Sequence, residues 1–441
     1  MFDAFSQQIS KALGPELQPT AAVTVTGNAE LPSCFAVSDL ASATISAAAQ
    51  ELVALAHADT VAVDARLASL WFDMTLRPTT WELPSAWDAI AGVYEANDGW
   101  IRLHTNAPHH RDAALHVLGC AADKPAVAEA VAQWGKTELE TAIVLAGGAA
   151  AAMHSMKDWA AHPQGKAILQ EPLIHWREKD RDAPPATLQG LKVLDLTRVL
   201  AGPVASRFLA GFGADVLRID PPWWNEPGVE PEVTVGKRRA GLDLTQAEDR
   251  ARFEDLLREA DVLVHGYRPG ALEDLGFGPE ALYRLAPHMI EVSLCAYGWT
   301  GPWADRRGFD SLVQMSCGIA AEGMRRAGRD GPVPLPVQAL DHATGYLMAA
   351  AALRAVRQCN ANGRIMAARL SLARTASLLT DVGPREFIGE DVIETRGDVE
   401  PVAELTDWGK AHRLRFPVEL GGKPIRWQIP AGNLRVDRPY W

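Results

Sequence analysis

The chain has 441 residues, of which 48% are hydrophobic and 22% are charged, a composition ordinary for a globular protein. This length exceeds what one hydrophobic core usually serves, so two domains are expected. The formal net charge of −12 at pH 7 argues against nucleic acid or an anionic membrane as a partner, and an anionic ligand would need a local basic patch.

The location of the protein is indicated by what its sequence lacks. The first residues, "MFDAFSQQISKALGPE", show no basic start followed by an apolar core, so we expect no signal peptide. The longest apolar run, residues 142–153, is too short to span a bilayer. The five cysteines are an odd number, lie far apart and include no C-x-x-C pair. This favours a reducing cytoplasm over a disulfide framework or a structural zinc site.

An alanine-rich helix with an aspartate near its start is expected twice. Asp39 stands in "SDLASATISAAAQELVAL" and Asp341 in "LDHATGYLMAAAALRAV". After one single-residue gap, the Arg-Leu pair at 66–67 aligns with that at 369–370, so helix, polar turn and strand occur twice. Such an aspartate is either an N-cap, which accepts hydrogen bonds from free N–H groups, or a nucleophile in the field of the helix terminus.

The clearest pattern begins after residues 178–190, whose charges and prolines are typical of an interdomain linker. A strand, a tight Gly-Pro turn, a short helix ending at Gly213 and a second strand ending at Asp220 follow within about 30 residues, as in a β-α-β unit. The segments are, in that order, "LKVLDLT", "VLAGP", "VASRFLAGFG" and "ADVLRID".

The alternation continues through an amphipathic helix at 246–260, a third strand in "DVLVHGY" and a fourth in "MIEVSLCAYG". This predicts a doubly wound α/β domain that binds its ligand at the carboxyl ends of the strands. The first loop, "TRVLAGPVA", lacks the three glycines of a dinucleotide fingerprint. Asp220 stands where a ribose-binding acid would, but two prolines follow it, so an NAD enzyme is disfavoured.

From "GLKVLDLTRVLAGPVASRFLAGFGADVLRID" onward the chain resembles the family III coenzyme A transferases, of the formyl-CoA and carnitine-CoA transferase type. The resemblance covers residues 188–380. It runs through "VGKRRAGLDL", "ADVLVHGYRPGALEDLGFGPEAL", "VSLCAYGWTGPWADRRGFDSLVQMSCGIA" and "GRDGPVPLPVQALDHATGY". It implies that Asp341 is the nucleophile.

The first half of the chain resembles later parts of the same family. "SDLASATISAAAQEL" is similar to the nucleophile helix, "EANDGWIRLHTNAPHHRDAALHVLG" to the start of the small domain and "MKDWAAHPQG" to its end. The last stretch, "RFPVELGGKPIRWQIPA", is similar to the family's return strand. The chain therefore resembles a permuted or fused-copy member. We expect a nucleophile-helix segment at 1–60 packing on the large domain, a small α+β domain at 60–180 and a Rossmann-like, CoA-binding large domain at 185–441.

The implied activity moves CoA between carboxylic acids, which calls for a covalent carrier. The Asp341 carboxylate would attack the acyl-CoA to give a mixed anhydride and a thiolate. The thiolate would then return to make an aspartyl-CoA thioester. We expect the helix N-terminus to favour the ionised form of Asp341, and nearby N–H groups to hold the developing oxyanion.

The resemblance also implies a set of CoA-binding residues, basic where they meet phosphate. They are Val199, Ala201, Lys237, Gly266, Arg268 and Arg307. Two features count against full activity: Asp274 stands where the family often has arginine, and no glycine-run loop occurs in residues 74–99.

Other functions remain open. Acyl-CoA racemases of the family carry a Gly-His-Asp motif, which here has Phe309 in place of histidine, so one of two bases is missing unless His342 replaces it. A non-catalytic CoA-binding relative is the other alternative. We expect acyl-CoA and a small carboxylic acid as substrates, no metal, no permanently bound cofactor and a homodimer. We expect Asp39 to be a helix cap left from a duplication.

Overall fold

The computed structural model describes residues 1–14, 17, 22–56, 58–182, 186–388 and 392–441. Its largest sheet has seven strands, and all neighbours are parallel except the last pair. Leaving out β7, the strands lie in the order 3-2-1-4-5-6, as in dinucleotide-binding folds. Across the sheet they are β10 (Lys237–Gly241), β9 (Asp215–Asp220), β8 (Lys192–Leu196), β11 (Val262–His265), β12 (Ile290–Cys295), β13 (Arg364–Ser371) and β7 (His175–Asp182).

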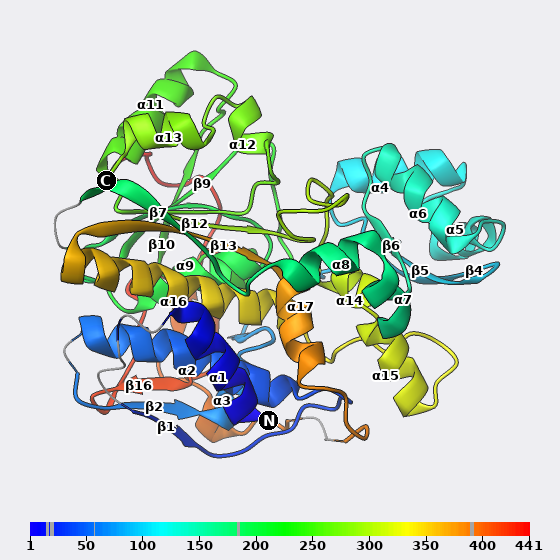
Figure 1. Cartoon of the computed structure of the whole chain (residues 1–441), viewed down its shortest axis with the longest axis horizontal. Helices are drawn as coiled ribbons and strands as arrows, with labels where there is room; N and C mark the ends of the chain where they lie inside the picture. The colour runs from blue at the N-terminus through cyan, green and yellow to red at the C-terminus, as the bar shows by residue number, and fades with distance from the viewer. Residues whose placement is uncertain (15–16, 18–21, 57, 183–185, 389–391) are drawn as a thin grey trace.

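Helices cover both faces of this sheet, so the expected doubly wound α/β class is confirmed (Figure 1). On one face lie α11 (Ala247–Glu259), α12 (Ala271–Asp274) and α13 (Pro279–Leu285). On the other lie α9 (Ala201–Gly211) and α16 (Ala339–Asn362). Strands such as β8 and β11 are buried on both faces, which explains their nearly continuous apolar sequences.

Local patterns located the strands more accurately than the turns. The four strands expected from the sequence are β8, β9, β11 and β12. The sequence analysis missed β10, whose "KRRAG" sequence is basic. It also placed a turn at "VLAGP", whereas α9 already begins at Ala201, with Pro203 in its first turn.

The repeated helix and strand occur as expected and pack together. α2 (Val37–Leu55) is followed by β2 (Val61–Asp64) and α3 (Ala65–Leu70), just as α16 is followed by β13 and α17 (Leu372–Asp381). β2 has a parallel neighbour, β1 (Val23–Thr26), and an antiparallel one, β16 (Val418–Leu420), which also pairs with β17 (Lys423–Pro424). β13 likewise lies between parallel β12 and antiparallel β7.

The two copies form consecutive layers of one core. From top to bottom, Figure 1 shows the seven-stranded sheet, α16, α2 and the four-stranded sheet, with α1 (Phe2–Leu13) beside α2. A buried ion-pair cluster joins the two helices: Glu51 on α2 lies 2.6 Å from both Arg354 and Arg357 on α16. Because these charges are buried, removing one partner would leave the other uncompensated.

The remaining elements build two smaller sheets. One has β4 (Gly92–Ala96), β5 (Gly99–Leu103) and β6 (Ala150–Ala152), with helices α4 (Pro108–Leu118), α5 (Lys124–Val131) and α6 (Lys136–Leu145) around a core of its own. The other has β14 (Glu404–Thr406), β15 (Gly409–Arg413) and β3 (Leu76–Pro78). Short helices complete the fold: α7 (Met156–Ala161), α8 (Pro163–Gln170), α10 (Glu230–Val233), α14 (Asp310–Ser316), α15 (Ile319–Ala327) and the 3-10 turn Arg396–Asp398.

Two local expectations were wrong. Residues 178–182 of the expected linker belong to strand β7, which pairs with β13; residues 183–185 lie outside the described part of the chain. Asp39 is also no N-cap: the N-cap of α2 is Ala36, and Asp39 lies in the first turn. In the described part of the chain no helix is long and apolar enough to cross a membrane. The expected domain limits stay a prediction.

Candidate active site

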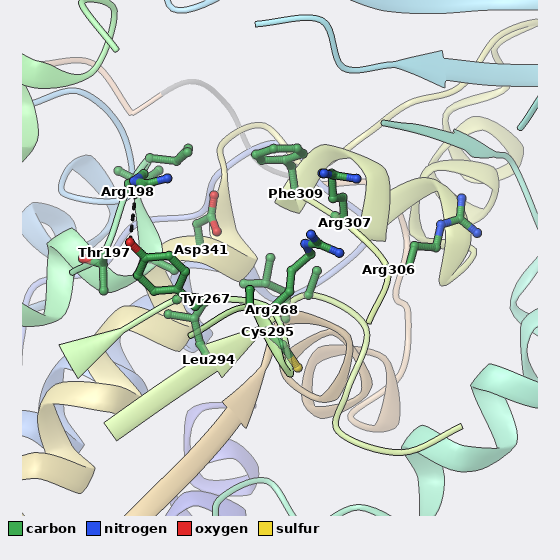
Figure 2. A pocket seen from close by; sticks show the side chains of 18 of the residues that line it. Thr197, Arg198, Tyr267, Arg268, Leu294, Cys295, Arg306, Arg307, Phe309 and Asp341 are labelled. Carbon is green, nitrogen blue, oxygen red and sulfur yellow. Dashed lines mark hydrogen bonds between the residues drawn. The ribbon is translucent and has the colours of Figure 1, made fainter. Parts of the chain in front are cut away.

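A cavity of about 370 Å³ opens at the carboxyl ends of the parallel strands. Its floor comes from the ends of β8, β11 and β12, where the strand order reverses and such folds bind ligands. Asp341, at the start of α16, faces this space between Arg198 and Phe309 (Figure 2).

The turn from β8 to α9 forms one wall under backbone strain. Val199 lines the cavity with a φ of 64°, a left-handed conformation that is an outlier for a β-branched residue. Its N–H donates to the carboxylate of Glu226 at 2.8 Å, which helps to hold the strained turn. Such strain gathers at functional sites. Ala201, the first residue of α9, also lines the cavity, and N–H groups in a first helical turn have no partner within the helix.

Lys237 lies beneath this turn and outside the cavity, which corrects its expected role as a CoA ligand. Its side chain is fully buried, and its Nζ donates to Asp195 and to the carbonyl of Pro203, each at 3.0 Å. Burial lowers the pKa of Lys237 to about 8. Asp195 also accepts hydrogen bonds from Thr197 and from Ser206 on α9. Lys237 therefore supports the β8–α9 turn through Asp195 and does not face a ligand.

Two buried carboxyl groups meet at the start of α16. One oxygen of Asp310 accepts hydrogen bonds from the backbone N–H groups of Leu340 at 2.8 Å and Asp341 at 2.9 Å, and the other accepts from Gln314. Asp310 thus serves as the anion at this helix N-terminus, where free N–H groups favour negative charge. In the described part of the chain, no hydrogen bond to the Asp341 carboxyl is recorded.

The pKa of Asp341 differs from expectation. Burial, and then the negative charge of Asp310, raise the pKa of Asp341 well above its ordinary value. Burial also raises the pKa of Asp310 to about 6, but the hydrogen bonds donated to it act in the opposite direction. Because Asp310 occupies the N–H groups of the helix terminus, it is the carboxyl that ionises first. The expectation that the helix terminus would favour the ionised form of Asp341 was wrong, because burial and Asp310 raise the pKa of Asp341.

Three arginines line the cavity without a carboxylate partner among the described residues: Arg198, Arg268 and Arg307. Arg198 lies 4.7 Å over the ring of Trp224 and donates to the Tyr267 hydroxyl. Arg306 differs, because it pairs with Glu140 at 2.8 Å. The three unpaired guanidinium groups form the local basic patch that an acidic protein needs for an anionic ligand.

Histidines from the part of the chain that contains the β4–β5–β6 sheet lie in or beside the same cavity. His110 lines it, with its ring 5.7 Å from the ring of Phe309, and neither ring nitrogen has a hydrogen-bond partner among the residues that the structure describes. Burial lowers its pKa to about 3, so the ring is neutral. His104 stacks on Phe309 at 3.7 Å. His342, in contrast, is buried against Phe72 outside the cavity lining, so it is not the replacement base considered from the sequence.

The structure therefore brings most of the expected site residues together. Asp341 and five of the six expected CoA ligands line one cavity: Val199, Ala201, Gly266, Arg268 and Arg307. Cavity residues that were not expected from the sequence include Arg198, Trp224, Tyr267 and His110. Arg198 and Tyr267 each lie two residues after the end of a strand, β8 and β11, a position that marks them as candidates. His110 and Trp224 carry no such signal.

Comparison with known proteins gives the class. The model of CoA-transferase family III matches residues 188–408, and the chain belongs to this family. It is 34% identical over 195 residues to the acetyl-coenzyme A transferase nodX of Hypoxylon pulicicidum, covering 43% of this chain and 33% of that protein.

Two other relatives are named for dicarboxylic acids. The chain is 31% identical over 277 residues to the succinyl-CoA:glutarate CoA-transferase of Mus musculus, covering 59% of this chain and 56% of that protein. It is 36% identical over 161 residues to the acetyl-CoA:oxalate CoA-transferase of Acetobacter aceti, covering 34% of this chain and 41% of that protein. The chain spans about half the length, or less, of these relatives.

Proposed function

We propose that the protein is a CoA transferase that moves coenzyme A between carboxylic acids through a covalent intermediate on Asp341. The main support is that Asp341 faces a cavity at the point where the strand order reverses. Three arginines that have no carboxylate partner among the described residues line this cavity. Phosphates of CoA would bind Arg268, Arg307 and Arg198. The thioester carbonyl would lie between Asp341 and the first turn of α9.

The proposed reaction steps transfer CoA without hydrolysing the thioester. An oxygen of ionised Asp341 attacks the acyl carbonyl carbon, the carbon–sulfur bond breaks, and CoA thiolate leaves a mixed anhydride. The thiolate attacks the Asp341 carbonyl carbon of the anhydride and releases the donor carboxylate. An acceptor carboxylate then attacks the aspartyl thioester and reverses the sequence. Free N–H groups in the first turn of α9 would stabilise the oxyanions, and burial of the site would keep water from the anhydride.

Replacement of Asp341 tests this function. Asp341→Asn should abolish transfer and the hydroxylamine-sensitive acyl adduct detected by intact mass, because an amide is a poor nucleophile. The fold should persist, since Asn keeps the shape and buries no charge. The matched control is Asp39→Asn in the first-turn position of α2, which should keep both transfer and adduct. Activity surviving in Asp341→Asn, or an adduct carried by another residue, would contradict the proposal.

One observation favours a second function, acyl-CoA racemisation or isomerisation. His110 has free ring nitrogens and lines the same cavity as Asp341, so two groups capable of proton transfer face one substrate. Solvent deuterium entering the acyl group of an acyl-CoA without transfer of CoA would identify this activity. Binding of CoA with neither adduct nor deuterium exchange would identify a non-catalytic relative.

We further propose that the protein acts in the cytoplasm as a homodimer. The cytoplasmic location is supported by the odd number and wide spacing of the five cysteines, which include no C-x-x-C pair. The substrates would be an acyl-CoA and a small carboxylic acid, with CoA as a substrate and not a resident cofactor.

A further inference from the structure

A second chamber of about 210 Å³ adjoins the cavity that holds Asp341. The two spaces share three lining residues, Val199, Trp224 and Phe309. An acyl group whose carbonyl lies beside Asp341 would therefore extend past Phe309 into this chamber. Its walls come from residues 85–88, 104, 106–107 and 224–229, and from Val199 and Phe309.

More of the contact surface of this chamber is apolar than polar. Rings of Trp87, Trp224 and Phe309 line it, together with Ala107 and Val229. Apolar lining of this kind favours apolar ligand groups by removing their surface from water.

Several polar groups of the lining already have protein partners. Asn106 donates to the carbonyl of Ala86 at 2.8 Å and accepts from the N–H of Asp88 at 3.0 Å. Asp88 accepts from the Thr105 hydroxyl at 2.7 Å. Asn225 accepts from Arg435 at 2.7 Å. Among the described residues, His104 Nδ1 is the exception in this lining: it is buried and has no hydrogen-bond partner.

The charges of the chamber disfavour an acidic ligand. Its lining, as far as the structure describes it, contains Asp88 and Glu226 but no lysine or arginine. Both carboxylates pair with arginines outside the lining: Glu226 with Arg218 on β9, and Asp88 with Arg111 at 3.5 Å. His104 also lines the chamber, and burial holds its pKa well below the ordinary value, so it supplies no positive charge. A second carboxylate on the acyl group would be buried without a counter-charge, which is costly.

We infer that this chamber binds the acyl group, and that the substrate class is a neutral, apolar monocarboxylic acyl group of about six to eight carbons, such as a phenyl-bearing or branched chain. This inference rests on the proposed function. The size follows from the volume, because a cavity of about 150 Å³ holds one benzene molecule. The selectivity would differ from that of the two relatives named for glutarate and oxalate.

Calorimetry on the Asp341→Asn protein tests the inference without turnover. Phenylacetyl-CoA should bind at least tenfold more tightly than free CoA, because the ring leaves water for the chamber. Succinyl-CoA should bind no more tightly than free CoA. Val229→Phe fills the chamber and should reduce the phenylacetyl advantage to less than threefold. The matched control is Val402→Phe, at a residue that is 67% exposed, and it should keep the full advantage.

The outcomes separate the inference from the proposed function. Succinyl-CoA binding as tightly as phenylacetyl-CoA, or an unchanged advantage in Val229→Phe, would overturn the chamber assignment even where the wild-type protein transfers CoA. Wild-type protein that shows the affinity ratio but no transfer and no adduct would retain the chamber and overturn the proposed function. Absence of binding by free CoA and by both thioesters would overturn the two together.

Discussion

The carboxyl groups of Asp310 and Asp341 both lie at the N-terminus of α16 but make different contacts there. Asp310 comes from α14 and accepts the first-turn N–H groups of α16, whereas Asp341 belongs to α16 and faces the cavity. Two neighbouring carboxyl groups do not both ionise easily. The charge of Asp310 therefore helps Asp341 to keep its own proton to higher pH. Asp310 is therefore a positioning residue that also sets when the proposed nucleophile becomes charged.

The pH dependence of transfer should report this coupling. Attack requires ionised Asp341, so kcat/KM should rise with pH through the raised pKa of Asp341. Asp310→Asn removes the neighbouring negative charge and should move the midpoint of that rise to lower pH by about one pH unit. The rate profile of Asp39→Asn should keep the wild-type midpoint. A midpoint unchanged in Asp310→Asn would show that the two carboxyl groups are not coupled.

Arg307 and Lys237 should behave differently, although both are basic residues that the sequence placed among the CoA ligands. Arg307→Ala removes an unpaired charge from the cavity lining and should weaken CoA binding about tenfold, more at low salt than at high salt. Lys237→Ala leaves Asp195 buried without its ion-pair partner, so it should lower the free energy of unfolding by about 3–5 kcal/mol. Calorimetry and chemical denaturation measure the two effects. An Arg307→Ala protein with wild-type affinity would place the phosphates elsewhere.

At the scale of elements, the site depends on how closely α16 approaches α9. Gly345 makes this approach possible: a Cβ at this position would lie 2.4 Å from the carbonyl oxygen of Ala201 and 2.8 Å from the Cβ of Val204. The corresponding position in α2 is Ala43, and α2 packs on α16 instead. The glycine therefore brings the helix of Asp341 against the turn that carries Val199.

Gly345→Ala should push the two helices apart. Alanine raises helix propensity, but the clash is with backbone of α9, which has little room to move. We expect the free energy of unfolding to fall by about 1–3 kcal/mol and CoA binding to weaken, because the first turn of α9 shifts. The matched control is Gly397→Ala, where an added Cβ has its nearest neighbour at 3.7 Å. Stability equal to wild type would contradict the close-packing argument; denaturation and calorimetry provide the comparison.

At the scale of the whole molecule, the seven-stranded and the four-stranded sheet each include an antiparallel strand from the other half of the chain. β7 follows the small sheet of the first half and pairs with β13, while β16 lies near the end and pairs with β2. The two halves cannot separate without breaking both sheets. The α2–α16 contact likewise joins the two repeat copies inside one chain (Figure 1).

The homodimer remains a prediction that this arrangement makes worth testing. Sedimentation at micromolar concentration should give twice the chain mass of 47.7 kDa. If the protein sediments only as a monomer, the intramolecular pairing of the repeat copies would have replaced the association between chains.

Four strands of the large sheet, the repeat and the edge of the sheet where ligands bind could be predicted from the sequence alone. Apolar strands such as "LKVLDLT" alternate with helices, and parallel strands all bring their carboxyl ends to one edge, so loops carrying Val199, Gly266 and Arg268 had to converge. The tertiary structure decided the rest. It turned Lys237 inward, placed Asp310 on the terminus of α16 and brought His110 to the cavity across some 200 residues of sequence. Such contacts follow from long-range packing and the burial of charge, which leave no local periodicity in the chain.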